Sequence, residues 1–386
     1  MSPSARRAAW TAAQIALTAV ALVVVFRSVR LRDQVRVDGG PARPARAVET
    51  DAGRTTVVWT DGTREAFEAG RAEVEPGLLP LLRGVDRPAA AALTAMLLLP
   101  MGLLSARWWL LLRGQGLRLP YARIFGVTWA GIFFNQLLPG GVGGDVTKAV
   151  LASAGEDRKA AVVATVLLDR IIGLVVMVFL GAGCLAPFAG RFQDPALPAA
   201  VFGLAAALTA GYLAYFNPML RRVLAGRLPF IRTLRALDEV FRSARLDRRR
   251  TLLAAAISMA AQASTILIIY GLARALGIVE IPLWQFFVFE PIIFVVTALP
   301  ISVGGWGVQE AVYVYLFGTM GGLEPGRAVA LSLLFKGATL ASALPGGLLF
   351  ALGVGRPRIP PSAEQGEEPR PGPWAPARID IIQPCL

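Results

Sequence analysis

The sequence contains no histidine, so it lacks the side chain that most often acts as a general base near neutral pH. Histidine-dependent triads and histidine-ligated metal sites are excluded for the same reason. The two cysteines, Cys184 and Cys385, do not suggest a disulfide framework, because one lies in an apolar stretch and the other at the end of the sequence. We therefore expect a protein that is not an enzyme, with no catalytic residue, no metal and no cofactor.

Charge is also scarce, since charged residues make up 17% of the 386 residues and soluble domains carry about a quarter. Hydrophobic residues make up 55%, and the mean hydropathy is +0.56. Several nearly uncharged stretches approach 20 residues, which as helices would cross a hydrocarbon core of roughly 30 Å. The net charge of +13 comes from arginines in the loops between these stretches. We therefore expect a polytopic membrane protein and not a nucleic-acid binder.

The apolar stretches predict an all-α fold of about six full spans, with two further pairs of helices that are each broken in the middle. The predicted full spans lie near residues 9–26, 88–112, 160–185, 196–216, 251–276 and 327–353. The broken pairs lie near 124–153 and 283–318. The expected domains are an N-terminal signal-anchor helix (1–26), an extracytoplasmic insertion (27–87), a transmembrane domain (88–353) and a disordered tail (354–386).

Loop charges orient these spans, because basic loops stay on the cytoplasmic side. The loop 217–250 carries ten arginines against three acids, whereas 27–87 is nearly neutral. With the N-terminus inside, loop 217–250 and the tail both face the cytoplasm only if each broken pair turns back to the side it entered from. We therefore expect two re-entrant hairpins in inverted arrangement and both termini in the cytoplasm.

The insertion 27–87 is the one segment with soluble character. Thr55–Trp59 alternates as a β-strand does, and Asp61 and Gly62 then predict a tight turn. We expect a small β-rich module outside the membrane.

The first break falls within Phe133–Lys148, where one proline and four glycines follow Leu138 and cannot continue a helix. Irregular backbone at membrane depth is tolerated only inside protein or beside water. Asp145 is expected at the N-cap of the resuming helix, where free N–H groups suit an anionic ligand. The alternative is that the glycines only permit close helix packing. Neither a P-loop nor a dinucleotide fingerprint fits this spacing.

The second break repeats the pattern Leu-Pro-x-x-Val-Gly-Gly, which occurs at Leu138–Gly144 and at Leu299–Gly305. Paired broken helices in opposed halves indicate a transporter with its site near the membrane midplane. The candidate substrate-binding residues around the two breaks are Asn135, Pro139, Gly143, Gly144, Asp145, Lys148, Gly304, Gly305, Trp306 and Glu310.

Ionisable residues inside the apolar spans complete the candidate site. Asp169 and Arg170 lie near the middle of one span and Lys336 near the middle of another. Each such group costs about 2.5–3.5 kcal/mol on insertion scales, so each needs a partner or a polar cavity. We expect Arg170 or Lys148 to pair with Asp145, and Lys336 to pair with Glu310 or Glu290. The alternative is interhelical ion pairs with no role in substrate binding.

Three segments together resemble the lysylphosphatidylglycerol synthase transmembrane (flippase-like) family. They are Phe133–Pro139 with Gly143–Asp145, Leu167–Gly173 and Pro300–Glu310, in this order and spacing. The resemblance covers roughly 88–353, without the family's aminoacyl-transferase domain. It departs from the family at Lys148, where arginine is common, and this change loses the bidentate fork.

The resemblance implies lipid handling in a cell (inner, cytoplasmic) membrane. The expected function is a flippase or transporter that moves an anionic phospholipid or glycolipid headgroup through a polar midplane cavity. The expected partners are membrane lipids and an enzyme that modifies lipids or transfers sugars, with no nucleic acid. Two alternatives remain open: a membrane enzyme, or a non-transporting partner in the assembly of lipid-linked glycans or aminoacyl lipids.

Overall fold

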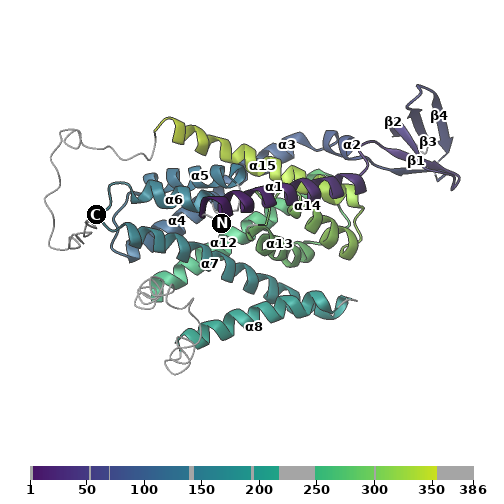
Figure 1. Ribbon diagram of the computed structural model, residues 1–386. Coiled ribbons are helices and arrows are strands. Elements are labelled where there is room, and N and C mark those ends of the chain that lie inside the picture. Colours follow the sequence, from purple (N-terminus) through teal and green to yellow (C-terminus); the bar gives the residue numbers. More distant parts are fainter. Residues whose placement is uncertain are drawn as a thin grey trace, which may run out of the picture.

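The computed structural model describes residues 3–51, 54–68, 70–138, 143–192, 195–216, 248–299 and 301–353. Most of these residues form helices that pack side by side, and a small sheet lies beyond one end of them (Figure 1). Loop 217–247 and the predicted tail lie outside the described residues. The helices are α1 (Pro3–Ser28), α2 (Leu78–Arg83), α3 (Arg87–Met96), α4 (Leu98–Gly114), α5 (Tyr121–Leu137), α6 (Gly143–Ser153), α7 (Lys159–Leu185), α8 (Ala196–Phe216), α12 (Arg248–Ala275), α13 (Leu283–Ala298), α14 (Val308–Tyr313) and α15 (Pro325–Ala351).

Among the described residues, four helical stretches are long and apolar enough to cross a membrane. They are Arg87–Gly114, Lys159–Arg191, Arg249–Ala275 and Pro325–Ala351. Three shorter apolar helical stretches accompany them, at Ala12–Val25, Ala196–Gly211 and Leu283–Ala298. The chain is therefore a helical membrane protein, and the count of about six full spans stays a prediction.

The span expected as one helix near 88–112 consists of two helices, α3 and α4, that meet at Leu97. Pro100 lies in the first turn of α4 and has no backbone N–H, so the carbonyl of Met96 loses its helical donor. The predicted span is nevertheless present as the apolar helical stretch Arg87–Gly114, and only the interruption at Leu97 was not expected.

Helices α5 and α6 form an antiparallel hairpin. At its open end, Arg123 of α5 donates hydrogen bonds to the carbonyls of Leu151 (3.2 Å) and Ala154 (2.7 Å). Near the turn, Gly144 of α6 lies against α5, where its N–H donates to Asn135 Oδ1 at 2.7 Å. The end of α6 therefore returns to the level at which α5 begins.

Helix α13 and the segment after the second break form a second antiparallel hairpin. Across its middle, the Tyr313 hydroxyl donates to Glu290 Oε1 at 2.6 Å. At its open end, a methyl group on Gly321 would lie 3.2 Å from Ile281 Cδ1. The returning arm of this hairpin consists of helix α14 and the π-helical segment that follows it, Val314–Met320. Both broken pairs are therefore antiparallel helical hairpins, and their re-entry into the membrane stays a prediction.

Helices α12, α13 and α15 share the largest apolar core, which includes the fully buried rings of Phe286, Phe289 and Phe317. The rings of Phe289 and Phe317 meet edge to face at 5.2 Å. Helix α8 lies at the edge of the bundle and packs on α7 (Figure 1). The core therefore surrounds the second hairpin and fixes its position.

The insertion folds as a five-stranded antiparallel sheet, which Figure 1 shows at the right. The strands are β1 (Gln34–Val37), β2 (Arg43–Asp51), β3 (Arg54–Trp59), β4 (Arg64–Glu68) and β5 (Ala72–Glu75), in the spatial order β4-β3-β2-β1-β5. The predicted strand Thr55–Trp59 is β3, and the turn after it contains Gly62 at a φ of 90°. Val35, Val57 and Trp59 form the small core of the module.

The sheet joins the helices through a narrow neck. Asp33 Oδ1 accepts a hydrogen bond from the N–H of Gly77 at 2.7 Å, and the N–H of Leu78 donates to the Arg30 carbonyl at 2.9 Å. Helix α1 itself packs on the second break, where Thr18 Oγ1 accepts from the Val303 N–H at 3.0 Å. The segments before and after the sheet are thus held together, and α1 covers part of the break.

Candidate functional site

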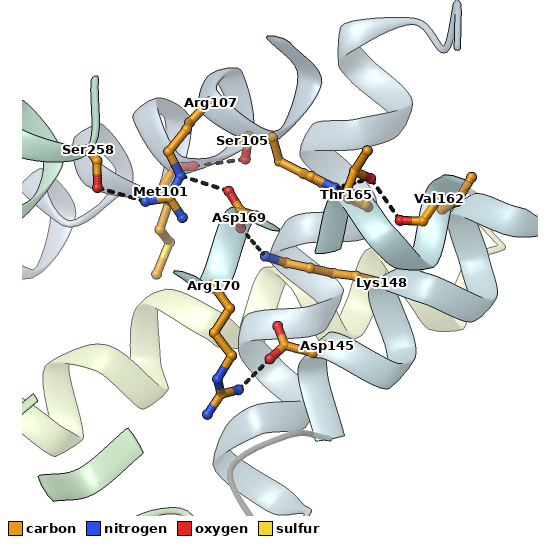
Figure 2. Close-up of polar contacts among 11 residues, drawn as sticks. Met101, Ser105, Arg107, Asp145, Lys148, Val162, Thr165, Asp169, Arg170 and Ser258 are labelled. Carbon is orange, nitrogen blue, oxygen red and sulfur yellow. Dashed lines mark hydrogen bonds and ion pairs between the residues drawn. The ribbon is translucent and has the colours of Figure 1, made fainter. Parts of the chain in front are cut away.

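A buried ionic cluster centres on Asp169 of α7 (Figure 2). Arg107 Nε of α4 donates to Asp169 Oδ1 at 2.7 Å, and Lys148 Nζ of α6 lies 3.5 Å from Asp169 Oδ2. Arg107 also donates to Ser258 Oγ of α12 at 2.8 Å, and the Lys148 ammonium lies 5.4 Å from the centre of the Trp108 ring. One carboxylate and two cations therefore connect four helices away from solvent.

The next residue on α7, Arg170, joins the two breaks. Its guanidinium forms an ion pair with Asp145 in the first turn of α6, and Figure 2 shows the two side chains pointing toward each other. Its second terminal nitrogen donates to the Ala298 carbonyl at 2.9 Å. Because Ala298 is the last residue of α13, Arg170 holds the beginning of α6 close to the end of α13.

The glycines of the first break pack closely. A methyl group on Gly144 would meet the Gly131 carbonyl and the Asn135 side chain, and one on Gly143 would meet Leu138. Their role in close packing is therefore visible, and a role in ligand binding stays a prediction. Pro139 lies outside the described residues.

The expected N-cap position of Asp145 was wrong. Helix α6 already begins at Gly143, so Asp145 is its third residue. Asn135 satisfies the N–H of Gly144 instead, which leaves the Asp145 carboxylate available for Arg170.

The second break depends on left-handed glycines. Gly304, Gly305 and Gly307 have φ angles of 55°, 75° and 79°, which side chains rarely adopt. A methyl group on Gly304 would lie 2.9 Å from the Gln136 carbonyl near the end of α5. The two breaks therefore meet in space.

A second buried ion pair stabilises this break. Lys336 Nζ of α15 lies 3.3 Å from Glu310 Oε1 and 4.2 Å from the centre of the Trp306 ring. Glu310 Oε2 accepts from the Gly307 N–H at 2.6 Å, and Ser332 Oγ lies 3.4 Å from Oε1. The Lys336 ammonium has no hydrogen bond of good geometry, so charge and the aromatic face hold it.

The expected pairings are confirmed as Arg170 with Asp145 and Lys336 with Glu310. Lys148 pairs with Asp169 instead, because Asp169 and Arg170 point to different sides of α7. Sequence reasoning missed Arg107 and its partner Ser258. The signal was present, since Arg107 is an isolated charge within the apolar span 88–112.

The four cations differ in exposure. The Arg170 side chain is 27% exposed, compared with 11% for Lys148, 5% for Arg107 and 4% for Lys336. A guanidinium offers a planar fork that matches a phosphate or carboxylate. Arg170 can therefore exchange its partner most readily. No group of three or more potential metal ligands occurs among the described residues.

The fold and these intramembrane charges define a polytopic membrane protein with two broken-helix hairpins. Residues 73–347 match the family described as Lysylphosphatidylglycerol synthase TM region, and the chain belongs to that family. This confirms the resemblance seen in the sequence. The match begins within β5 and ends within α15, so most of the sheet lies outside it. No curated protein matches the chain.

Proposed function

We propose that this chain moves lipids with an anionic headgroup across a cell membrane, and that Arg170 binds the headgroup. The main support for this proposal is the Arg170–Asp145 ion pair, which is partly exposed at the place where both breaks meet. An incoming phosphate offers the guanidinium oxygen acceptors as Asp145 does, so Arg170 stays paired when the lipid replaces the carboxylate. The released Asp145 side chain is 21% exposed and lies in the first turn of α6, so water and the positive end of that helix stabilise its charge.

The helix that begins beside Asp145 supports the same ligand. Helix α6 has 11 residues, and the N-terminus of such a helix carries a partial positive charge. The neighbouring Lys148 shares the Asp169 carboxylate with Arg107, so this buried cluster keeps one net positive charge and adds positive potential without contacting the ligand. Two cations and a helix end thus favour an anionic over a zwitterionic headgroup.

The proposal includes the topology: the two hairpins turn back within the membrane from opposite faces, and both termini are cytoplasmic. The antiparallel contacts in each hairpin support a return to the side of entry. The lengths of α5 and α13 also support re-entrant hairpins. These helices have 17 and 16 residues and extend about 25 Å, which is less than a hydrocarbon core of roughly 30 Å. Opposed hairpins then expose the Arg170 site to each leaflet in turn.

The test uses the full chain in liposomes with fluorescent phosphatidylglycerol, whose movement between leaflets is followed by chemical quenching from outside. Wild type is expected to accelerate this movement, and to act less on labelled phosphatidylcholine. Arg170→Ala should lower the rate about tenfold or more, because a charged hydrogen bond contributes about 1.5–3 kcal/mol. Arg170→Lys should keep part of it.

Arg191→Ala is the matched control, since this exposed arginine lies after α7 and contacts Phe188. It should leave the rate unchanged. If wild type moves several labelled anionic lipids no faster than liposomes without protein do, the proposal is overturned. A chain that does not move lipid would instead fit an enzyme, or a partner of a lipid-modifying or sugar-transferring enzyme.

A further inference from the structure

Glu290 of α13 differs from the other acids described above within the helical bundle, which are Asp145, Asp169 and Glu310. It is 4% exposed, yet no basic side chain lies within 4.0 Å of its carboxyl group in the described parts of the chain. Asp169, Asp145 and Glu310 each have a cation. An isolated carboxylate is costly in an apolar interior, so this residue needs either a partner or a proton.

Among the residues that the structure describes, the one hydrogen bond to the Glu290 carboxyl comes from Tyr313 of α14, at 2.6 Å. Helices α7, α12 and α14 pack on α13, and their other titratable or charged groups are Lys159, Asp169, Arg170 and Cys184 of α7, Arg248, Arg249, Arg250, Tyr270 and Arg274 of α12, and Glu310 of α14. Lys159 and the three arginines begin their helices, whereas the contacts with α13 near Glu290 come from Gly181 and Tyr270, close to the other ends. Asp169 pairs with Arg107 and Lys148. Arg170 is bound to Asp145 and the Ala298 carbonyl, and Arg274 to Tyr270 and the Ile278 carbonyl. Neither Arg170 nor Arg274 therefore forms an ion pair with Glu290.

Glu290 also lies at a weak point of its helix. The next residue, Pro291, has no N–H, so the carbonyl of Phe287 four residues earlier loses its helical donor. Pro291 packs against Gly181 of α7, where an added methyl group would lie only 2.8 Å away. A change of charge at Glu290 thus acts where α13 bends most easily and where it touches the helix that carries Arg170.

We propose that Glu290 is a proton-binding site that couples lipid movement by this chain to a proton gradient. The carboxylate takes up one proton from the aqueous phase on one side and releases it on the other, and no other bond changes. Tyr313 keeps its hydrogen bond to the carboxyl group in both states. The inference rests on the proposed function for the coupling, although proton binding itself does not require it.

The first measurement is infrared difference spectroscopy of the purified full chain during a pH titration. Beside the bands of the exposed acids, wild type should show a separate carbonyl band from one protonated carboxylic acid in an apolar site, and this band should disappear as the pH rises. The band should be absent in Glu290→Gln and present in Glu280→Gln, whose carboxyl lies in the loop before α13. Tyr313→Phe should shift the midpoint of the titration, and this variant serves if Glu290→Gln does not fold.

The second measurement is the liposome assay with a pH gradient. For one proton per lipid, a gradient of one unit should produce up to about a tenfold difference in the distribution of labelled phosphatidylglycerol. Glu290→Gln should abolish this response while lipid still equilibrates, and Glu280→Gln should retain it. If Glu290→Gln keeps the separate band of the acid in an apolar site, or keeps the wild-type response to the gradient, the inference is overturned. A wild-type band without any lipid movement would overturn the proposed function alone.

Discussion

The two halves of the membrane domain, α5–α6–α7 and α13–α14–α15, place their charges at matching positions. Asp145 is the third residue of α6, and it pairs with Arg170, the twelfth residue of α7. Glu310 is the third residue of α14, and it pairs with Lys336, the twelfth residue of α15. Helices α7 and α15 both have 27 residues. Each hairpin is thus tied to the helix that follows it by the same kind of link.

The two links differ in their access to solvent. The side chains of Arg170 and Asp145 are 27% and 21% exposed, whereas those of Lys336 and Glu310 are 4% and 0% exposed. A partly exposed pair can exchange one member for a ligand at little cost, but a buried pair cannot be opened without stranding a charge. Equivalent positions therefore hold an ion pair that solvent reaches in one half and an ion pair shielded from solvent in the other.

The largest expected effect comes from breaking the buried link. Lys336→Ala should lower the free energy of unfolding by about 3–5 kcal/mol, because Glu310 would remain buried without a cation. Arg170→Ala, the same change in the matching pair, should cost only about 1–2 kcal/mol. Denaturation of both variants in mixed detergent micelles measures the difference.

The double variant Glu310→Gln with Lys336→Met separates charge from packing. It should recover much of the stability lost in Lys336→Ala, since neither charge is then stranded. Equal losses for Lys336→Ala and Arg170→Ala would show that exposure does not distinguish the two links.

Much of this arrangement could be predicted from the sequence. Hydropathy located the helices, and the repeated Leu-Pro-x-x-Val-Gly-Gly pattern located both breaks, because proline and clustered glycines act on the local backbone. The cost of an unpaired charge in an apolar span led to the Arg170–Asp145 and Lys336–Glu310 pairs as expected pairings, with Lys148 and Glu290 as the alternative partners.

Other features depend on distant packing and could not be predicted in this way. Asp169 pairs with Arg107, which lies 62 residues earlier in the chain, and nothing local indicates that α4 and α7 meet there. The contact of Gly304 with the Gln136 carbonyl likewise requires the two hairpins to be placed side by side. Sequence patterns indicate that buried charges need partners, but tertiary packing chooses which ones.

A smaller effect should distinguish how the two breaks use glycine. Gly144→Ala should cost about 1–3 kcal/mol, because the new methyl group would collide with the Gly131 carbonyl. Gly305→Ala meets nothing closer than 3.8 Å, so its cost of roughly 1–2 kcal/mol comes from a φ of 75°. Gly183→Ala, in open space on α7, should instead stabilise the helix by up to about 1 kcal/mol.

Replacement by other residues separates the two causes. At position 305, asparagine should be tolerated better than alanine, because it adopts left-handed backbone more readily. At position 144, asparagine should lower stability more than alanine does, because its larger side chain collides with more atoms. The same order at both positions would contradict this division between contact and backbone.

The smallest expected effect concerns the open ends of the two hairpins. In the first half, Arg123 closes the open end on backbone carbonyls, which do not titrate. In the second half, Arg327 donates to Glu280 Oε1 at 2.6 Å. Partial burial is the largest single influence on the Glu280 carboxyl and opposes its ionisation. The hydrogen bond and charge of Arg327, together with the backbone N–H groups of Glu280 and Val279, outweigh it and lower the pKa of this carboxyl below its ordinary value of 4.5.

Because the pKa is lower in the folded state, the pair stabilises the protein above about pH 4.5, and this contribution is lost as the pH falls through the folded pKa. The Glu280 side chain is 51% exposed, so the loss should not exceed about 1 kcal/mol. Unfolding of wild type and Glu280→Gln between pH 7 and pH 3 measures it as the difference between their pH dependences. Arg123→Ala should lower stability equally at both pH values, because its acceptors are carbonyl groups. Identical pH dependence in wild type and Glu280→Gln would show that the two open ends are closed by equally pH-insensitive contacts.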